Sequence, residues 1–166
     1  MIKRIYAFFL LRCAQKYFLQ EKIDKGICLL EKCILLKPDY SFAYFQLAKK
    51  FLELEKWEKA EESIIKAISL DLKNAIYHAF LGIVFYEQKK YEEAVQSLHK
   101  ALDIDSKNQL TYNYLALCYL AKEDEENFKS LLQKKGIFES TEVQVQMILG
   151  LENYLTKKEK KIPQNS

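Results

Sequence analysis

The residue types most able to carry out chemistry are few in this chain and lie far apart. Histidine occurs only at His78 and His99, and neither position forms a pair with metal-ligand spacing. The sequence contains no glycine-rich phosphate loop and no serine nucleophile elbow. We therefore expect His78 to pack like an aromatic residue and His99 to lie exposed. The pattern predicts no enzyme activity, no cofactor and no bound metal.

The spacing of the cysteines does not indicate a metal or redox site. Cys13, Cys28, Cys33 and Cys118 include no two residues spaced as a metal knuckle or a redox pair. We expect them to be small, buried apolar residues of a protein in a reducing compartment. Cys13 and Cys33 fall on facing helices of one expected hairpin, so a disulfide between them stays an open alternative.

Charge also narrows the possible partners. The chain has 26 Lys and Arg against 23 Asp and Glu, a net charge of +3, and the two signs are interleaved. This balance gives no electrostatic footprint for nucleic acid. A basic run at residues 157–161 is expected to be the solvated end of a helix. Acidic clusters such as Glu92-Glu93 are expected at helix starts, where negative charge is favourable.

The chain repeats itself at a shift of 34 residues. With only 4 Gly and 2 Pro in 166 residues, helices are the expected elements. Four copies emerge at residues 7–40, 41–74, 75–108 and 109–136. Within each copy the apolar positions recur at three- and four-residue steps, which indicates the buried stripes of two amphipathic helices. We write "column" for the residues that share a place in successive copies.

Each column has a characteristic size of side chain. Small residues should let two antiparallel helices approach closely, and aromatic residues should fill the wider space beside them. The columns are Cys13, Leu47, Leu81 and Leu115; Ala14, Ala48, Gly82 and Ala116; Tyr17, Phe51, Phe85 and Tyr119; Gly26, Ala60 and Ala94; Leu30, Ile64, Leu98 and Leu132; and Cys33, Ala67 and Ala101.

The third copy in particular resembles a known repeat family. Its matching residues are Leu81-Gly82, Phe85, Tyr91, Ala94, Leu98 and Ala101, which are similar to the signature of the tetratricopeptide repeat at the same 34-residue period. The resemblance implies an all-α, right-handed solenoid of about four helix-turn-helix hairpins with a carboxy-terminal capping helix. We expect one domain over residues 1–161, with a last repeat ending at Gly136, a capping helix at about 141–160 and a disordered tail at 162–166.

In that family the first helix of each hairpin lines a concave groove, and the register assigns four columns to it. Only three of these positions are frankly polar, so the predicted peptide-binding groove is mainly apolar. Its columns are Phe8, Phe42, Ile76 and Leu110; Leu11, Phe45, Ala79 and Asn113; Gln15, Lys49, Ile83 and Leu117; and Phe18, Leu52, Tyr86 and Leu120.

The composition of the groove favours one kind of ligand. Family members that bind the acidic tail of heat-shock chaperones use a clamp of Lys, Asn and Arg at such positions. Here Lys49 matches, with Arg12 and Asn113 nearby, but apolar residues fill the remaining positions. We expect the groove to bind an extended apolar peptide or an amphipathic helix. The replacement of Phe45 and Ile83 by Glu is expected to abolish capture of the partner without unfolding the chain. The expected anchors are Phe42, Phe45, Ile76, Ile83, Tyr86, Leu110 and Leu117.

Two other roles remain compatible with the sequence: a chaperone of the secretion type and a structural subunit that self-assembles. The protein is expected to be cytoplasmic, without a membrane span, because the seven apolar residues 5–11 are too few to cross a bilayer. Export is the alternative if residues 1–14 act as a signal, although cleavage there would remove most of a helix that the repeat requires.

Overall fold

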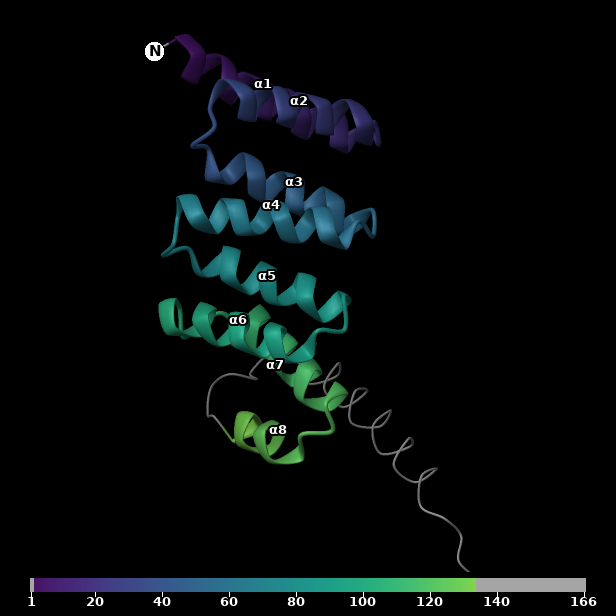
Figure 1. The fold of residues 1–166 in the computed structure, drawn as a ribbon, viewed down its shortest axis with the longest axis vertical. Helices are drawn as coiled ribbons and strands as arrows, with labels where there is room; N and C mark the ends of the chain where they lie inside the picture. Colours follow the sequence, from purple (N-terminus) through teal and green to yellow (C-terminus); the bar gives the residue numbers. More distant parts are fainter. Residues whose placement is uncertain (1, 134–166) are drawn as a thin grey trace, which may run out of the picture.

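The computed structural model describes residues 2–133, which form a stack of helical hairpins and contain no β-strand. Figure 1 shows the hairpins following one another along the long axis of the molecule. The all-α fold predicted from the repeat is confirmed. The helices are α1 (Ile2–Leu19), α2 (Ile23–Leu36), α3 (Ser41–Glu53), α4 (Trp57–Leu70), α5 (Ala75–Glu87), α6 (Tyr91–Ile104), α7 (Gln109–Ala121) and α8 (Glu125–Leu132).

Some of the expectations lie outside the described residues. These are the end of the fourth repeat at Gly136, the capping helix at 141–160 and the tail at 162–166.

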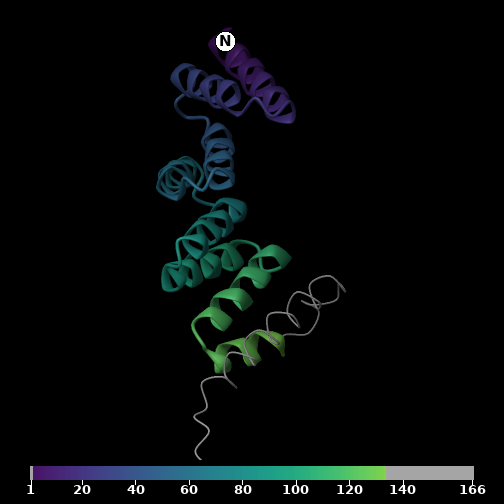
Figure 2. The same ribbon diagram turned by 90° about the vertical axis from the view of Figure 1, so that its right-hand side faces the viewer.

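Each odd-numbered helix packs against the helix that follows it, and the second helix of one hairpin packs against the first helix of the next. Figure 2 shows α2 and α4 on the opposite side of the stack from α1 and α3. Because each helix pair leaves part of its apolar surface uncovered, only stacking can complete the core.

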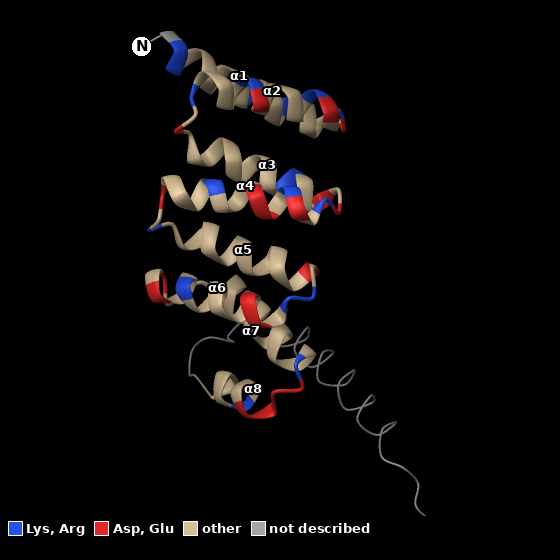
Figure 3. Ribbon diagram, viewed as in Figure 1, with Lys and Arg blue, Asp and Glu red and all other residues tan. Residues whose placement is uncertain are grey.

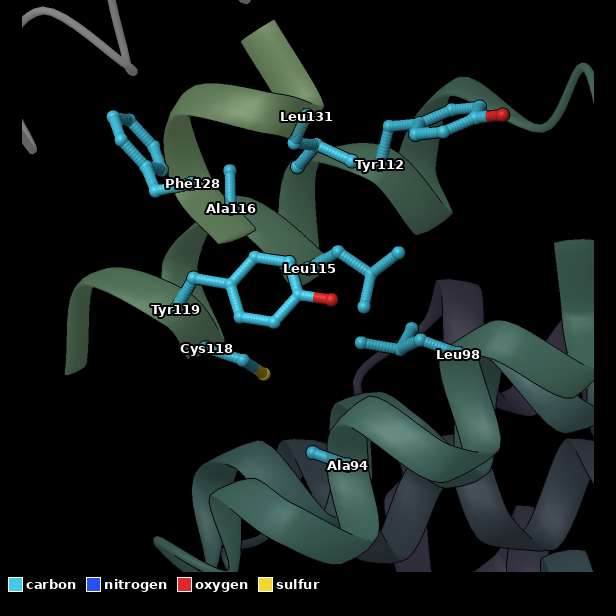
Figure 4. Packing of buried hydrophobic residues seen from close by; sticks show 9 residues of the cluster. All are labelled: Ala94, Leu98, Tyr112, Leu115, Ala116, Cys118, Tyr119, Phe128 and Leu131. Atoms are coloured by element: carbon cyan, nitrogen blue, oxygen red, sulfur yellow. The ribbon is translucent and has the colours of Figure 1, made fainter. Parts of the chain in front are cut away.

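Most members of the predicted buried columns are buried in the structure, although Cys13, Leu81 and the aromatic residues Tyr17, Phe51 and Phe85 are half-buried and Leu132 is exposed. Leu30, Ile64 and Leu98 are each 0% exposed, as are the small residues Ala60 and Ala94 beside them. The close approach that these small residues allow lets the larger side chains interdigitate across the helices. Figure 4 shows Leu98 on α6 directed at Leu115 on α7, inside the cluster that joins the third hairpin to the fourth.

The first helix is longer than the repeat predicted. Helices α3, α5 and α7 begin at the first residues of their copies, whereas α1 begins at Ile2, five residues before Ala7. Copies two to four follow a turn, such as the one at residues 37–40 with its Pro38. No turn precedes Ala7 within the described residues, so the helix continues toward the amino terminus.

All four hairpins turn in the same way. Glu21, Glu55, Lys89 and Glu123 share a column and all have positive φ, between 56° and 61°. In the second hairpin the Lys56 amide donates to the Phe51 carbonyl at 2.8 Å and the Glu55 amide donates to the Leu52 carbonyl at 3.0 Å. This is the Schellman ending of a helix, which normally places glycine at the left-handed position. The chain uses charged residues there instead.

Replacing Glu55 with glycine is expected to raise the stability of the protein. A side chain at positive φ costs about 1 kcal/mol, and glycine removes this cost while adding some entropy to the unfolded chain. We expect the free energy of unfolding to rise by up to about 1 kcal/mol in urea titrations. Glu55→Val serves as the contrast, because a β-branched residue is disfavoured at positive φ and should lower stability. An unchanged Glu55→Gly protein would mean that the loop carries no strain.

Candidate binding surface

One column of the predicted groove is exposed in every hairpin. Its members are the second residues of α3, α5 and α7 and the seventh residue of α1, and each is apolar. They are Phe8, 53% exposed, Phe42, 36%, Ile76, 57%, and Leu110, 50%. We call these four residues the apolar row. Large apolar side chains that stay exposed in register along a surface are typical of an interaction site.

The second column lies deeper and serves partly as core. Leu11 is 3% exposed and Ala79 is 2% exposed. Phe45 is half-buried, with its ring centroid 5.1 Å from that of Tyr77 and 5.3 Å from that of Phe80, both on α5. It therefore joins the second hairpin to the third. Asn113, the polar member of the column, is half-buried and accepts a hydrogen bond from Gln109 at 3.4 Å.

The burial of Ile83 and the packing of Phe45 argue against the expectation that both residues can be replaced by glutamate without unfolding. Ile83 is only 7% exposed, and Phe45 packs against the cluster around Ile64 and Tyr77. A carboxylate at either place would be buried without a partner, which is costly. The period of the sequence placed both residues on the right helices, but it could not show that the neighbouring hairpin covers them.

The fourth column, together with Leu117 of the third, forms a half-buried floor of the predicted groove. Leu52, Tyr86 and Leu117 are half-buried, as are Phe18 and Leu120. The Tyr86 ring lies 5.6 Å from the ring of Tyr114 and 5.8 Å from that of Tyr91, measured between centroids. Loss of hydration raises the pKa of Tyr86 above its usual value, so its hydroxyl stays neutral at physiological pH.

Polar groups gather toward the amino-terminal half of the predicted groove. Gln15 and Lys49 are both exposed, and the Lys49 Nζ lies 6.0 Å from the centroid of the Phe45 ring. In the same column, Ile83 and Leu117 occupy the third and fourth hairpins. Figure 3 shows the same change along the stack, because α5 and α7 are almost free of charged residues while α1 carries several. The surface therefore grows more apolar from α1 to α7.

The reactive residue types play structural roles. His78 donates from Nε2 to the Leu72 carbonyl at 3.0 Å, and the Nε2 atom of His99 lies 3.0 Å from the Tyr119 hydroxyl. Burial raises the pKa of Cys118 to about 12, so its thiol stays protonated and is a poor nucleophile. Within residues 2–133, no three His, Cys, Asp or Glu side chains are placed to hold a metal ion.

The cysteine expectation needs a correction. Cys33 and Cys118 are buried, but Cys13 is half-buried and Cys28 is exposed. All four are free thiols, and the Cys33 thiol donates to the Ala7 carbonyl at 3.1 Å. Cys28 is exposed because it lies two residues from each of the buried residues Gly26 and Leu30, which places it on the other side of the helix.

Sequence reasoning also missed a hollow between α1 and α2. It has a volume of about 200 Å³ and is lined by Tyr17, Lys25, Cys28 and Leu29. Small-molecule sites usually measure roughly 300 to 1,000 Å³, so this hollow is too small to be a candidate ligand site. Among the described helices, none has the length and apolar character to pass through a bilayer.

Comparisons with known proteins agree with the geometry. Residues 82–122 match the family model for the TPR repeat. The fold is similar to that of PilF from Pseudomonas aeruginosa, with a TM-score of 0.76 and 22% identity over 98% of this chain and 73% of that chain. It is also similar to the first TPR domain of Spaghetti (RPAP3) bound to the HSP90 peptide SRMEEVD, with a TM-score of 0.68 and 24% identity over 71% of this chain and 94% of that one.

A third similar structure is MamA from Desulfovibrio magneticus RS-1, with a TM-score of 0.66 and 14% identity over 87% of this chain and 75% of that chain. A search of curated protein sequences gives no significant match.

Proposed function

We propose that this chain, whose residues 82–122 match the TPR repeat model and whose fold is similar to that of solved TPR structures, is an adaptor that binds an apolar or amphipathic segment of another protein along the apolar row. TPR proteins mediate protein–protein interaction, and the proposal adds where and what this chain binds. The observation that carries it is the exposure of one large apolar side chain at the same place in each of the four hairpins.

The shape of the row supports an elongated ligand. Phe8, Phe42, Ile76 and Leu110 stand one to a hairpin, so a ligand that covers them must extend along the stack. The half-buried floor of the predicted groove offers further apolar surface, which a helix or a strand-like peptide could cover with alternating anchors. Burying such side chains stabilises a complex in proportion to the apolar area removed from water.

The proposed ligand differs from the one named for a structural relative. The HSP90 peptide bound to Spaghetti (RPAP3) has the sequence SRMEEVD, which carries three acidic residues in its last four positions. In this chain Lys49 is exposed in the groove, but the same column holds Ile83 and Leu117 in later hairpins. Carboxylates placed there would lose hydration without gaining charge-assisted hydrogen bonds. An apolar segment avoids this cost.

Charges introduced into the apolar row are expected to abolish partner capture. In the double variant Phe42→Glu and Ile76→Glu, both carboxylates remain hydrated in the free protein but would be buried in a complex. Affinity purification with quantitative mass spectrometry should then lose the proteins that the wild-type chain retains. Ile65→Glu is the matched control, because Ile65 is 47% exposed on α4, a second helix outside the row.

The result is read from the difference between variants. Proteins captured by the wild type and by Ile65→Glu, but lost from the double variant with unchanged circular dichroism, would support the row as the binding surface. Retention of the same proteins by the double variant would contradict it. If the wild type captures none and light scattering shows oligomers that the double variant lacks, the row is instead a surface for self-assembly.

A further inference from the structure

The outer face of α1 forms the amino-terminal end of the stack, and no described hairpin covers it. Ile5, Phe9, Arg12 and Lys16 follow one another at four-, three- and four-residue steps, so they form one stripe along the helix. Figure 1 shows α1 and α2 as the terminal hairpin. We call this stripe the end face. It is distinct from the core side of α1, where Ala7, Leu10 and Ala14 are buried.

The repeat shows what such a face normally contacts. Phe9 shares a column with Ala43, Tyr77 and Thr111, which are 0%, 4% and 0% exposed, whereas Phe9 is 59% exposed. Ala43 is buried in one cluster with Leu30 and Cys33 of α2, and Tyr77 is buried with Ile64 and Ala67 of α4. The column is thus covered by the second helix of the preceding hairpin. At α1 the equivalent covering helix is absent from the described residues.

The apolar end of the face is the unusual feature. Terminal repeats normally present a polar outer side to water, and Arg12 and Lys16 fit that rule, since Phe80 and Val84 occupy their columns in the third copy. Ile5 and Phe9 do not fit it, because they are 65% and 59% exposed. The end face is therefore half apolar and half basic.

The charges identify the chemistry of a matching helix. Helix α1 contains Lys3, Arg4, Arg12 and Lys16 but no acidic residue. Inside the stack, cations of one hairpin meet carboxylates of the preceding second helix. Lys90 Nζ lies 3.2 Å from Glu61 Oε2, and Lys122 Nζ lies 3.2 Å from Glu92 Oε1. Arg12 and Lys16 lie in other columns, but a helix that covers them would need carboxylates to pair with the two cations in the same way.

We propose that the end face binds an acidic amphipathic α-helix of another protein, which packs as an additional second helix ahead of α1. Its apolar stripe covers Ile5 and Phe9, and its carboxylates face Arg12 and Lys16. Pairing of two copies through α1 would bring like charges together. A copy's α8 is an incomplete match, because Glu126 stands in the column of Glu92 but Lys129 stands in the column where Glu61 accepts from Lys90.

The test uses two synthetic helical peptides of about 18 residues, long enough to hold a helix, with the same leucine stripe and either Glu or Lys on its flanks. The full chain is expected to bind the Glu peptide and not the Lys peptide by fluorescence anisotropy. The double variant Ile5→Ser and Phe9→Ser should weaken binding by about tenfold or more, because two apolar anchors are lost. Leu35→Ser is the matched control, since Leu35 is 80% exposed on α2.

Two further double variants separate the contribution of the charged residues to binding from that of the apolar row. Arg12→Gln with Lys16→Gln should weaken binding and reduce its dependence on salt, because the screened ion pairs are removed. Phe42→Glu with Ile76→Glu should leave binding of the Glu peptide unchanged. The test of the end face is therefore independent of the test of the apolar row.

Several results would overturn the proposal. Equal binding of the Lys peptide would remove the electrostatic argument, and full binding by the Ile5→Ser and Phe9→Ser variant would remove the apolar one. Binding only to vesicles that contain phosphatidylserine would make the end face a lipid-binding surface. Oligomers that form in the wild type and vanish in that variant would assign the face to a second copy of the chain. Circular dichroism of each variant confirms that the fold is retained.

Discussion

Replacing Leu98 with alanine is expected to lower the free energy of unfolding by about 2 to 5 kcal/mol. Leu98 is 0% exposed and belongs to the cluster that contains Leu115, Cys118 and Phe128, so it joins α6 to the last hairpin. Truncation leaves a cavity that the rigid helices around it can close only in part. Urea unfolding followed by circular dichroism measures the loss directly.

The chain supplies its own control for this experiment. Leu132 shares the column of Leu98 but is 39% exposed at the end of α8. Leu132→Ala should therefore cost about 1 kcal/mol or less, because little apolar area returns to water. If both substitutions had the same effect, the cluster around Leu98 would not be the core of the stack.

Replacing Gly82 with alanine is expected to destabilise the protein, although the sequence suggests the opposite. Ala14, Ala48 and Ala116 occupy its column, and alanine is favoured over glycine within a helix by about 1 kcal/mol. In the structure, however, a Cβ at Gly82 would lie 2.6 Å from Leu98 Cγ and 3.2 Å from the carbonyl oxygen of Ala94. Overpacking of this kind costs about 1 to 3 kcal/mol, which exceeds or cancels the helix preference.

The two substitutions are expected to compensate for each other. In a Leu98→Ala background the leucine atoms that a Cβ at Gly82 would meet are gone, so Gly82→Ala should become neutral or stabilising. A double-mutant cycle from urea unfolding should give a coupling of about 1 kcal/mol or more between the two positions. Additive effects would show that the close approach of α5 to α6 does not depend on Leu98.

Periodicity was a good guide to the fold because the same physical requirement recurs every 34 residues. Ala60 and Ala94 are fully buried because each lies where two helices must approach closely, and Ile64 and Leu98 fill the layer beside them. A position that must be small or large in each copy leaves a signal that a single sequence reveals. This is why helix pairs and buried columns could be predicted without a structure.

Exposure was harder to predict, because it depends on the neighbouring hairpin and not on the column alone. Phe9 and Ala43 share a column, yet the first is exposed and the second is buried, since only Ala43 has a preceding hairpin. For the same reason Leu11, Ala79 and Ile83 were assigned to the groove but are buried in the structure. The assignment of the groove as a binding surface remains a prediction.

The turns also gave no signal that could be read in advance. The residue with positive φ at the end of a helix is usually glycine, which can be recognised in a sequence. Here that conformation is adopted by Glu21, Glu55, Lys89 and Glu123. Backbone hydrogen bonds to the preceding helix impose it on these residues, so side-chain identity carries no information.

The spacing of the apolar row means that the affinity of the proposed adaptor should depend on the length of the ligand. Since each hairpin contributes one exposed apolar residue, Phe8, Phe42, Ile76 and Leu110 are separate increments of contact instead of parts of one pocket. A short ligand would engage two of them and a longer one would engage all four, with affinity growing by steps. Such a surface would rank its ligands by length, and a chain with one hairpin more or fewer would change the ranking without changing the chemistry.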